Sequence, residues 1–457
     1  MEQPTDSQQD SPRSGLDMRR VLPIFALVFV DVLGLTIVLP LLHLYGAAFG
    51  GGALEIGLIA AAFPMAQLIG VPFMGALSDR FGRKPLLLIS QITTCLSFIM
   101  LGFANSLVLV ILSRVLDGVF GANIATAQAA LTDITDDDNR AQGLGLIGAA
   151  FGLGFIFGPL IALISLEFTD NLGIPAFIAA AYSFISILLT LFVFDETLPP
   201  EKRALETPSL TSGLTNIMRA FAMPQVNVLL VLFFAQQVVF FGFEAMLGLF
   251  TLSRLGLLGQ GNALVFLMVG VVLVTVQARF IGRWSRKYGE RKLIYSALAL
   301  MGVGLILVAL TPSTPQPFYV RQIVENELRQ QSADSTESII GEIAVDLPSE
   351  EGRGIGGIVW LLIVIIPVSI GAGLIRPSLN SLITKSVPAG EYGRILGVSA
   401  ALGSAANALA PISGGLMFQQ FGTTIPFFVS GCLLAALAVV SGFVIHKQPA
   451  RKEPAQA

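Results

Sequence analysis

The sequence predicts an all-α membrane protein in which twelve transmembrane helices form two six-helix halves related as pseudo-repeats. Three observations predict this fold class. Of the 457 residues, 54% are hydrophobic and 12% are charged, whereas a soluble domain carries roughly 25% charged residues. The charged residues lie between long apolar blocks rather than along them. Two stretches of sequence also recur at corresponding places in the two halves.

Twelve apolar blocks have the length of transmembrane helices. A helix rises about 1.5 Å per residue, so roughly 20 residues cross the ~30 Å hydrocarbon core of a bilayer. The first block is longer than the apolar region of a secretory signal, and we expect it to remain as the first helix. The blocks lie at about 21–45, 54–78, 86–104, 107–130, 141–166, 173–195, 225–251, 262–284, 292–311, 356–380, 393–418 and 424–446.

Polar segments divide these blocks into two domains. Residues 1–17, rich in Gln, Ser, Asp and Pro, predict a disordered tail. The N-terminal half is 18–195, and the polar segment 196–224 is the linker to the C-terminal half, 225–446. Residues 447–457 form a second polar tail.

The basic residues predict the orientation of the helices in the membrane. An even number of spans places both termini on one side, and most Lys and Arg residues of the loops fall on that side. The other side carries Arg254 and the arginines of one long loop. Because basic loops are retained inside, we expect a multi-pass cell-membrane protein with both termini and the linker in the cytoplasm.

Two sequence motifs repeat between the halves, one in a loop and one in a helix. The stretch GALSDRFGRK at 75–84 returns as GRWSRKYGERK at 282–292, 207 residues later. The stretch LGLIGAAFGLGFIFGP returns as LGVSAALGSAANALAP, 252 residues later. The larger offset predicts an insertion in the second half, which we assign to an extracellular loop at 312–355. Paired six-helix repeats are typical of secondary transporters.

The insertion contains one segment with a helical pattern. Its sequence FYVRQIVENELRQQ places Tyr319, Ile323 and Leu328 among charged residues, which predicts a short helix with one apolar face. This helix either caps the exit of a transport path or takes no part in transport.

Four motifs of this chain, taken together, resemble those of one transporter family. GALSDRFGRK is similar to a motif between helices 2 and 3, and RVLDGVFGAN at 114–123 is similar to a helix 4 motif. GLIGAAFGLGFIFGP at 145–159 resembles an antiporter motif, and DVLGLTIVLP at 31–40 resembles an acidic first helix. The family is the major facilitator superfamily, in particular its twelve-helix drug:proton antiporters of the tetracycline-exporter branch. The resemblance implies export of lipophilic, drug- or tetracycline-like molecules by proton antiport and alternating access.

Two departures from that pattern concern the substrate. The antiporter motif of the family usually ends in two glycines, where this chain has Ala162 and Leu163. Tetracycline exporters usually carry an acid in helix 3, and the third block has none. The alternatives are a sugar or metabolite carrier of the same fold and a membrane sensor or scaffold that does not transport.

Three ionisable residues inside the apolar blocks are the candidates for proton coupling. Asp31 lies near the middle of the first helix, and an acid at that depth usually faces a cavity or a charged partner. Arg114, in the fourth helix, either faces Asp31 or pairs with Asp117 one turn away. With the resemblance, we assign proton coupling to Asp31, Arg114 and Asp117; a purely structural ion pair is the alternative.

The seventh block carries polar residues for a substrate. Gln236 and Gln237 lie near its middle and offer hydrogen bonds, while Glu244 lies nearer the outer end. Glu244 would bind a cationic group or line the outer gate. Because acids outnumber Arg114 inside the blocks, we expect cationic or zwitterionic lipophilic substrates.

The charged loop between the second and third helices predicts a cytoplasmic gate. Gly82 permits the turn, and Asp79 suits the N-terminus of the eleventh helix. Arg83 is expected to pair with Asp133 at the end of the fourth helix, and such pairs would join the two halves. In the alternative, the basic residues only fix the topology. The predicted gate comprises Gly75, Asp79, Arg80, Gly82, Arg83, Lys84 and Asp133.

Glycines in the fifth helix predict a close approach to a neighbouring helix. The resemblance implies that they also serve antiport, whereas ordinary close packing would need the same residues. This antiporter motif comprises Gly145, Gly154, Gly158 and Pro159.

The sequence gives other functional classes no support. The two cysteines lie inside apolar blocks and the two histidines lie far apart, so we expect no disulfide framework and no metal site. The nucleotide-binding pattern GxxxxGK[ST] is missing, and no nucleophile–base set emerges. We therefore expect a transporter rather than an enzyme, without a cofactor or nucleic acid, that acts as a monomer on a small lipophilic substrate, protons and the lipid bilayer.

Overall fold

The computed structural model describes residues 18–135, 137–168, 171–203, 210–224, 226–332, 345–388 and 391–446. Within these ranges the regular secondary structure is helical, and twelve helices or helix runs are long and apolar enough to cross a membrane. They coincide within a few residues with the twelve apolar blocks, which confirms the predicted fold class. The predicted tails at both ends of the chain lie outside the described residues.

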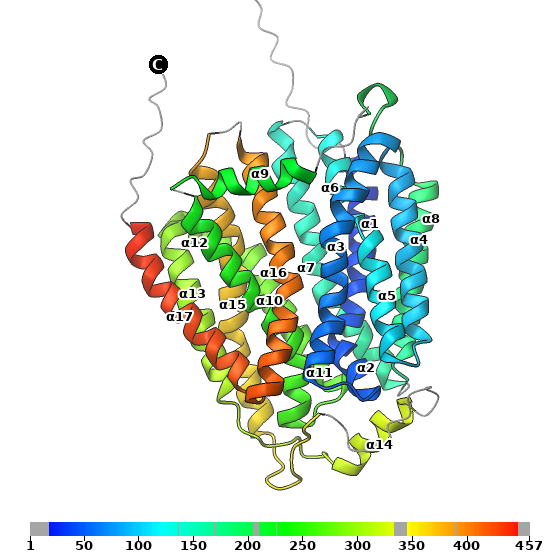
Figure 1. Ribbon diagram of the computed structural model, residues 1–457, viewed down its shortest axis with the longest axis vertical. Helices are drawn as coiled ribbons and strands as arrows, with labels where there is room; N and C mark the ends of the chain where they lie inside the picture. Colours follow the sequence, from blue (N-terminus) through cyan, green and yellow to red (C-terminus); the bar gives the residue numbers. More distant parts are fainter. Residues whose placement is uncertain are drawn as a thin grey trace, which may run out of the picture.

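The N-terminal half contains the first six spans (Figure 1). Its first span tightens into a 3₁₀ turn that contains Pro40, and its fourth span is broken into two helices. The spans are α1, η1 and α2 (Met18–Val38, Leu39–Leu41, Leu42–Ala48), α3 (Ala53–Phe81), α4 (Arg83–Gly102), α5 and α6 (Leu107–Phe120, Asn123–Asp133), α7 (Asp137–Glu167) and α8 (Gly173–Phe192).

The C-terminal half contains the other six spans. One of them includes a turn of π-helix, and three further short helices lie in loops. The spans are α10 (Asn227–Leu255), α11, η3 and α12 (Gly259–Thr275, Val276–Phe280, Ile281–Tyr288), α13 (Glu290–Ala309), α15 (Gly356–Lys385), α16 (Tyr392–Phe421) and α17 (Ile425–His446). The loop helices are η2 (Pro200–Lys202), α9 (Leu210–Phe221) and α14 (Arg321–Ser332).

The molecule has two ends, which we name by their loops. The basic face carries the α3–α4 turn and the linker helix α9, at the top of Figure 1. The insertion face is the opposite end and carries α14. The halves meet mainly where α3 packs against α16 and where α7 packs against α11.

The α3–α16 contact is tight near the insertion face and looser at the two glycines near the basic face. A Cβ atom on Gly57 would lie 2.4 Å from the carbonyl oxygen of Pro411 and 3.3 Å from the Cα of Gly415. Gly75 and Gly397 each lie 18 residues, five helical turns, from Gly57 and Gly415, so they share the same helix faces. A Cβ atom on either of them would meet nothing within 4 Å. The two helices therefore diverge towards the basic face.

The α7–α11 contact follows the same pattern. A Cβ atom on Gly270 would lie 2.4 Å from the carbonyl oxygen of Phe155, and one on Gly152 would lie 3.0 Å from Val274. Gly148 and Gly145 lie one and two turns further along the same face of α7, and their Cβ positions are open within 4 Å. The structure is closed at the insertion face and open at the basic face.

The insertion between α13 and α15 packs against the insertion face. Tyr319 is buried against Gly256, its hydroxyl donates to the carbonyl oxygen of Pro348 at 3.0 Å, and burial raises its pKa to about 12. Helix α14 lies on α2. The predicted apolar face was wrong at Ile323, which is 58% exposed, because the helix begins at Arg321 and turns Val324 inwards.

We predict that Gly57→Val destabilises the closed insertion face, because its side chain would collide with backbone atoms of α16. Overpacking of this kind costs roughly 1–3 kcal/mol. Gly442→Val on α17, where the Cβ position is open within 4 Å, is the matched control. The apparent melting temperature in detergent should fall for Gly57→Val and change little for Gly442→Val; equal effects would contradict the packing argument.

Candidate functional site

A buried ion pair occupies the middle of the fourth span. Arg114 and Asp117 are 2% and 3% exposed, and Arg114 Nη1 lies 3.5 Å from Asp117 Oδ2. Helix α4 supplies three further partners. Arg114 Nη2 donates to Ser97 Oγ at 3.0 Å, Thr94 Oγ1 donates to Asp117 Oδ1 at 2.8 Å, and the guanidinium lies 5.2 Å from the ring centre of Phe98. Both charges are thus satisfied inside the N-terminal half.

Asp31 has a different partner from either charge of that pair. Its Oδ1 accepts a hydrogen bond of 2.6 Å from Asn123 Nδ2, at the start of α6. The sequence analysis offered Asp31 or Asp117 as the partner of Arg114. In the described structure Arg114 forms its ion pair with Asp117 and not with Asp31. Sequence reasoning did not single out Asn123, although it is the last residue of the motif RVLDGVFGAN.

The break between α5 and α6 places Asn123 beside Asp31. Buried backbone groups must be paired, and polar side chains of α3 and α4 pair the groups that the break leaves free. Gln67 Nε2 donates to the carbonyl oxygen of Gly121 at 3.1 Å. Ser90 Oγ donates to the carbonyl oxygen of Phe120 and accepts from the amide of Ala122 at 3.1 Å.

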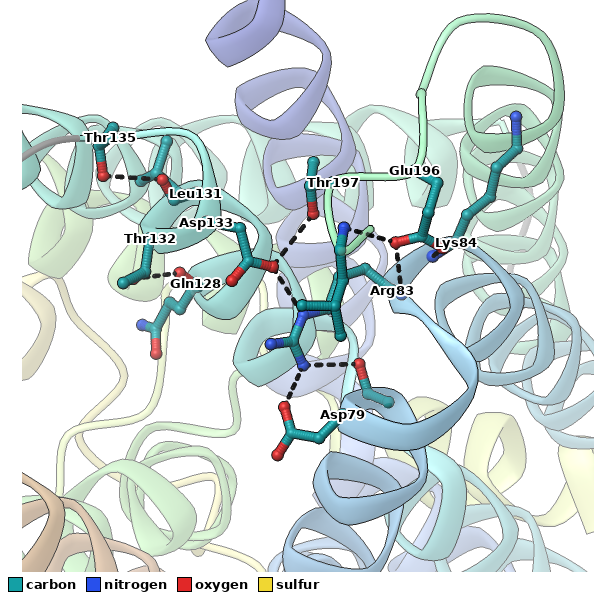
Figure 2. Close-up of polar contacts among 12 residues, drawn as sticks. Asp79, Arg83, Lys84, Gln128, Leu131, Thr132, Asp133, Thr135, Glu196 and Thr197 are labelled. Atoms are coloured by element: carbon teal, nitrogen blue, oxygen red, sulfur yellow. Dashed lines mark hydrogen bonds and ion pairs between the residues drawn. The ribbon is translucent and has the colours of Figure 1, made fainter. Parts of the chain in front are cut away.

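Arg83 is the centre of the charged turn at the basic face (Figure 2). Gly82, with φ of +105°, makes the turn that joins α3 to α4. Arg83 Nε donates to Asp133 Oδ2 at 2.9 Å, and its Nη1 donates to Asp79 Oδ1 at 2.6 Å and to Ser78 Oγ at 3.1 Å. The Arg83 side chain is 8% exposed. One guanidinium thus fastens the ends of α3, α4 and α6 together.

Glu196 completes this group. The sequence analysis had assigned Glu196 only to the linker. Its Oε1 accepts from the amide of Arg83 at 2.8 Å, and its Oε2 accepts from the amide of Lys84 at 3.1 Å (Figure 2). A carboxylate at the first amides of α4 is favoured by the helix dipole. Thr197 Oγ1 also donates to Asp133 Oδ2 at 3.2 Å. We call Ser78, Asp79, Arg83, Asp133, Glu196 and Thr197 the loop cluster.

The loop cluster joins residues of the N-terminal half to the first two residues of the linker and includes no residue of the C-terminal half. The expectation that the Arg83–Asp133 pair joins the two halves was therefore wrong, because both residues lie on the same side of the interface. Among the described residues Asp79 pairs with Arg83, and its side chain is 43% exposed. Arg80 stands apart from the cluster, with its guanidinium 5.3 Å from the ring centre of Phe81, while Lys84 Nζ donates to the carbonyl oxygen of Leu191 at 3.1 Å.

The second half repeats the central ion pair with its charges inverted. By the offsets of the repeat, Arg83 corresponds to Glu290 and Asp133 corresponds to Lys385. Lys385 Nζ donates to Glu290 Oε1 at 2.5 Å and joins the end of α15 to the start of α13. The same helix ends are joined in each half by an ion pair of opposite polarity.

Two further positions follow this inversion. Asp79 corresponds to Arg286, which reverses its charge, and Ser78 corresponds to Ser285. Ser78 accepts a hydrogen bond from Arg83, whereas Ser285 Oγ donates to Glu290 Oε1 at 3.4 Å. A hydroxyl group serves both arrangements because it is both donor and acceptor.

The predicted substrate residues all lie on α10. Gln236 and Gln237 are 1% and 4% exposed, and Gln236 Oε1 has no hydrogen-bond partner in the described structure. Glu244 lines a cavity between the two halves. It lies eleven residues, about 16 Å, from the end of α10, deeper than the shorter predicted helix indicated.

The antiporter-motif glycines have two environments. A Cβ atom on Gly158 would lie 2.0 Å from Thr36 Oγ1, and one on Gly154 would lie 2.4 Å from Val32, so α7 packs closely on α1 there. Thr36 Oγ1 donates to the carbonyl oxygen of Gly154 at 2.8 Å. Pro159 is buried, whereas Gly145 lies where the seam has opened.

Arg376 is an intramembrane charge that sequence reasoning missed. It is exposed although it lies within α15, nine residues or about 14 Å from the end of that helix. The described structure gives it no hydrogen bond or ion pair. The sequence signal was an arginine within the apolar block 356–380, in the stretch GLIRPSLN.

These features define a class of protein. A multi-pass membrane transporter has these features: two six-helix halves, charged residues inside the spans, and an interface between the halves that is closed at one face and open at the other. The chain belongs to the Major Facilitator Superfamily, whose family model matches residues 24–323 and 353–457. The unmatched segment between them falls in the insertion. This membership identifies a transporter and not an enzyme.

Individual relatives cover the chain to different extents. Tetracycline resistance protein, class B, of Escherichia coli is 30% identical over 271 residues, which are 58% of this chain and 66% of that protein, slightly under two thirds. Multidrug resistance protein 2 of Bacillus subtilis is 24% identical over 411 residues, 89% of this chain and 90% of that protein. The crystal structure of the human organic anion transporter MFSD10 (TETRAN) has the same fold, with a TM-score of 0.64 and 22% identity over 94% of this chain and 100% of that one.

The inverted repeat predicts the outcome of a charge exchange in the loop cluster. Arg83→Glu alone adds a fourth acid beside Asp79, Asp133 and Glu196. It should destabilise the protein by more than the ~1 kcal/mol of an exposed pair and less than the roughly 3–5 kcal/mol of a fully buried one. Adding Asp79→Arg and Asp133→Lys recreates the charges of the second half and should recover most of that loss. The apparent melting temperature in detergent measures both changes.

The control for this exchange is Arg80→Glu, which changes the same charge on a neighbouring residue outside the cluster. It should have little effect. A triple variant that is no more stable than Arg83→Glu would show that the two clusters are not equivalent.

Proposed function

We propose that this protein exports lipophilic small molecules by proton antiport and alternating access, with its basic face in the cytoplasm. The observation that carries the proposal is Asp31, a half-buried carboxylate in the interior of the first span that is held by Asn123. An acid inside a transmembrane segment usually serves a cavity, a substrate or an ion path. Similarity to a tetracycline and a multidrug resistance protein supports drug-like substrates.

In the proposed cycle the two faces open in turn. With the basic face open, Asp31 releases its proton to the cytoplasm and substrate enters between the halves from this face. Approach of α3 and α16 at Gly75 and Gly397 then closes this face. The insertion face opens, the substrate leaves, and an external proton binds. The buried Arg114–Asp117 pair anchors α5, the part of the fourth span that precedes the Asp31 partner Asn123.

The loop cluster has a structural part and a moving part in this cycle. Arg83, with Asp133 and Glu196, holds the helix ends of the N-terminal half. Asp79 is the exposed member of the cluster. When the basic face closes, Asp79 leaves Arg83 and contacts the start of α16. Cytoplasmic termini, a cytoplasmic linker and a monomeric transporter belong to the same proposal.

We predict that Asp31→Asn abolishes proton-coupled transport while the protein remains folded, because the amide cannot release a proton. Purified protein in liposomes with an imposed pH gradient measures substrate flux and proton movement together. Asp195→Asn, at an exposed acid after the sixth span, is the control and should transport normally. Full coupling in the Asp31→Asn variant would remove this residue from the mechanism.

The same assay separates the alternative functions. Substrate and proton fluxes in opposite directions indicate antiport, and fluxes in the same direction indicate a sugar or metabolite symporter. No flux of any tested compound indicates a sensor or scaffold. A growth panel of toxic compounds, with and without the protein, selects the substrates to test.

Arg376 favours a second candidate, the export of organic anions. The expected preference for cationic substrates depended on a count of buried charges that omitted this guanidinium. An exposed, unpaired arginine within a span is suited to a carboxylate, sulfonate or phosphate group. The fold is also shared with a human organic anion transporter, which makes anionic substrates a specific alternative.

We predict that Arg376→Gln weakens the transport of anionic substrates and spares cationic ones. A hydrogen bond to a charged group contributes roughly 1.5–3 kcal/mol, so KM should rise about ten- to a hundredfold. Arg219→Gln on the linker helix, where the arginine is exposed, is the control. An equal loss for substrates of both charges would assign Arg376 a structural role instead.

A further inference from the structure

The cavity between the halves is small and lies towards the insertion face. The N-terminal half contributes η1, α2 and α3 to its walls, and the C-terminal half contributes α10, α11 and α16. Its volume is about 60 Å³. A water molecule needs roughly 10–15 Å³ by this measure, whereas drug-sized ligands occupy pockets of about 300–1,000 Å³. In this state the cavity has room for a few water molecules and not for a transported drug.

One titratable residue from each half lines this cavity. They are His43 on α2 and Glu244 on α10. The other polar residues in the described lining are Asn262 and Asn407, which do not titrate. A proton that enters the cavity therefore has one acceptor on each side of the interface between the halves.

His43 is buried without a complete set of hydrogen bonds. It is 3% exposed, and its Nε2 has no hydrogen-bond partner in the described structure. Buried polar atoms are almost always hydrogen bonded, so an unpaired imidazole nitrogen beside a polar cavity indicates a proton or a hydrogen-bonding ligand at that place.

The ring of His43 lies against the helix face that carries Glu244. A Cβ atom on Gly248 would be 2.4 Å from His43 Nδ1, so glycine at this position makes room for the ring. Gly248 is four residues after Glu244 and therefore one helical turn, about 5.4 Å, along the same face. Asn262 Nδ2 fixes the segment before His43 through a hydrogen bond of 2.5 Å to the carbonyl oxygen of Pro40.

Three other charged residues near the cavity have their own partners outside it. Glu55 on α3 accepts from the amide of Gly52, and Arg254 on α10 donates to the carbonyl oxygen of Thr311. Asp31 lies twelve residues, about 18 Å, before His43 along the first span and bonds to Asn123. None of these three residues lines the cavity, so the charges of His43 and Glu244 are left to each other and to water.

We propose that His43 and Glu244 form a second proton-binding site, which holds the insertion face closed by sharing one proton between the two halves. With the proton bound, either an imidazolium faces a carboxylate or a neutral imidazole faces a carboxylic acid, and both forms attract across the interface. Loss of the proton leaves a neutral imidazole and a bare carboxylate, which gains hydration when the face opens. The proposal deepens the proposed function, on which it rests for the direction of proton movement.

Distance measurements between spin labels test the site without any transport. The labels are attached to Phe103→Cys and Phe421→Cys, which are exposed ends of the two halves near the insertion face, in a Cys95→Ser, Cys432→Ser background. A closing step that takes up one proton changes the ratio of open to closed molecules by up to about tenfold per pH unit. The long-distance population should therefore grow as the pH rises.

Single substitutions then locate the proton. His43→Gln and Glu244→Gln should each remove this pH dependence and still give one sharp peak in gel filtration. Glu167→Gln, at an exposed acid at the end of α7, should keep it. The proposal is overturned if the parent protein shows no pH-dependent distance change, or if both His43→Gln and Glu244→Gln retain it.

Asp31→Asn distinguishes this site from the proposed function. If Asp31→Asn removes the distance change while the His43 and Glu244 variants keep it, the second site is wrong and the proposed role of Asp31 stands. If the His43 and Glu244 variants remove it while Asp31→Asn keeps full proton-coupled transport, the second site stands and the proposed role of Asp31 is wrong.

Discussion

Backbone contact between the halves at Gly57, Pro411 and Gly415 is the constraint on which the rest of the structure depends. In a membrane, apolar surface does not drive helices together, so close packing and hydrogen bonds must do so. Both are concentrated near the insertion face here, where Asn262 bonds to Pro40 and Gln260 bonds to the carbonyl oxygen of Leu166. The small cavity around His43 lies where the seams are closed, and the seams at Gly75 and Gly145 are open because the helices diverge towards the basic face.

The charged groups are arranged so that this interface remains free to move. Every ion pair that the structure describes lies within one half or within the insertion. Arg114 is neutralised by Asp117 one turn away, and Asp31 is held by an uncharged amide. A buried ion pair between the halves would cost several kcal/mol to separate in each cycle. Pairing within each half therefore keeps the free energy needed for opening low.

Hydropathy predicted the spans well because burial in a bilayer is set by the length and composition of each block alone. The repeat offsets also predicted the insertion, and the Arg83–Asp133 contact followed from two helix ends on the same side of the membrane. Contacts that depend on helix rotation could not be predicted in this way. Glu196 reaches Arg83 across 113 residues, and Asn123 reaches Asp31 only because the fourth span breaks at Gly121. Arg376 was missed because one charge hardly changes the mean hydropathy of a long block, and Ile323 because the start of a short helix decides which residue turns inwards.

The inverted loop clusters show which part of the repeat the fold requires. Arg83–Asp133 and Glu290–Lys385 join the same pair of helix ends, and the serine beside each pair changes from acceptor to donor. The geometry therefore depends on an attraction at that point and not on which helix carries which sign. The sign decides something else, namely the net charge of these three positions in each half. Asp79, Arg83 and Asp133 carry one negative charge in excess, whereas Arg286, Glu290 and Lys385 carry one positive charge in excess. Two such sets of opposite net charge attract over roughly a Debye length, which favours closure of a face that the glycine seams leave open.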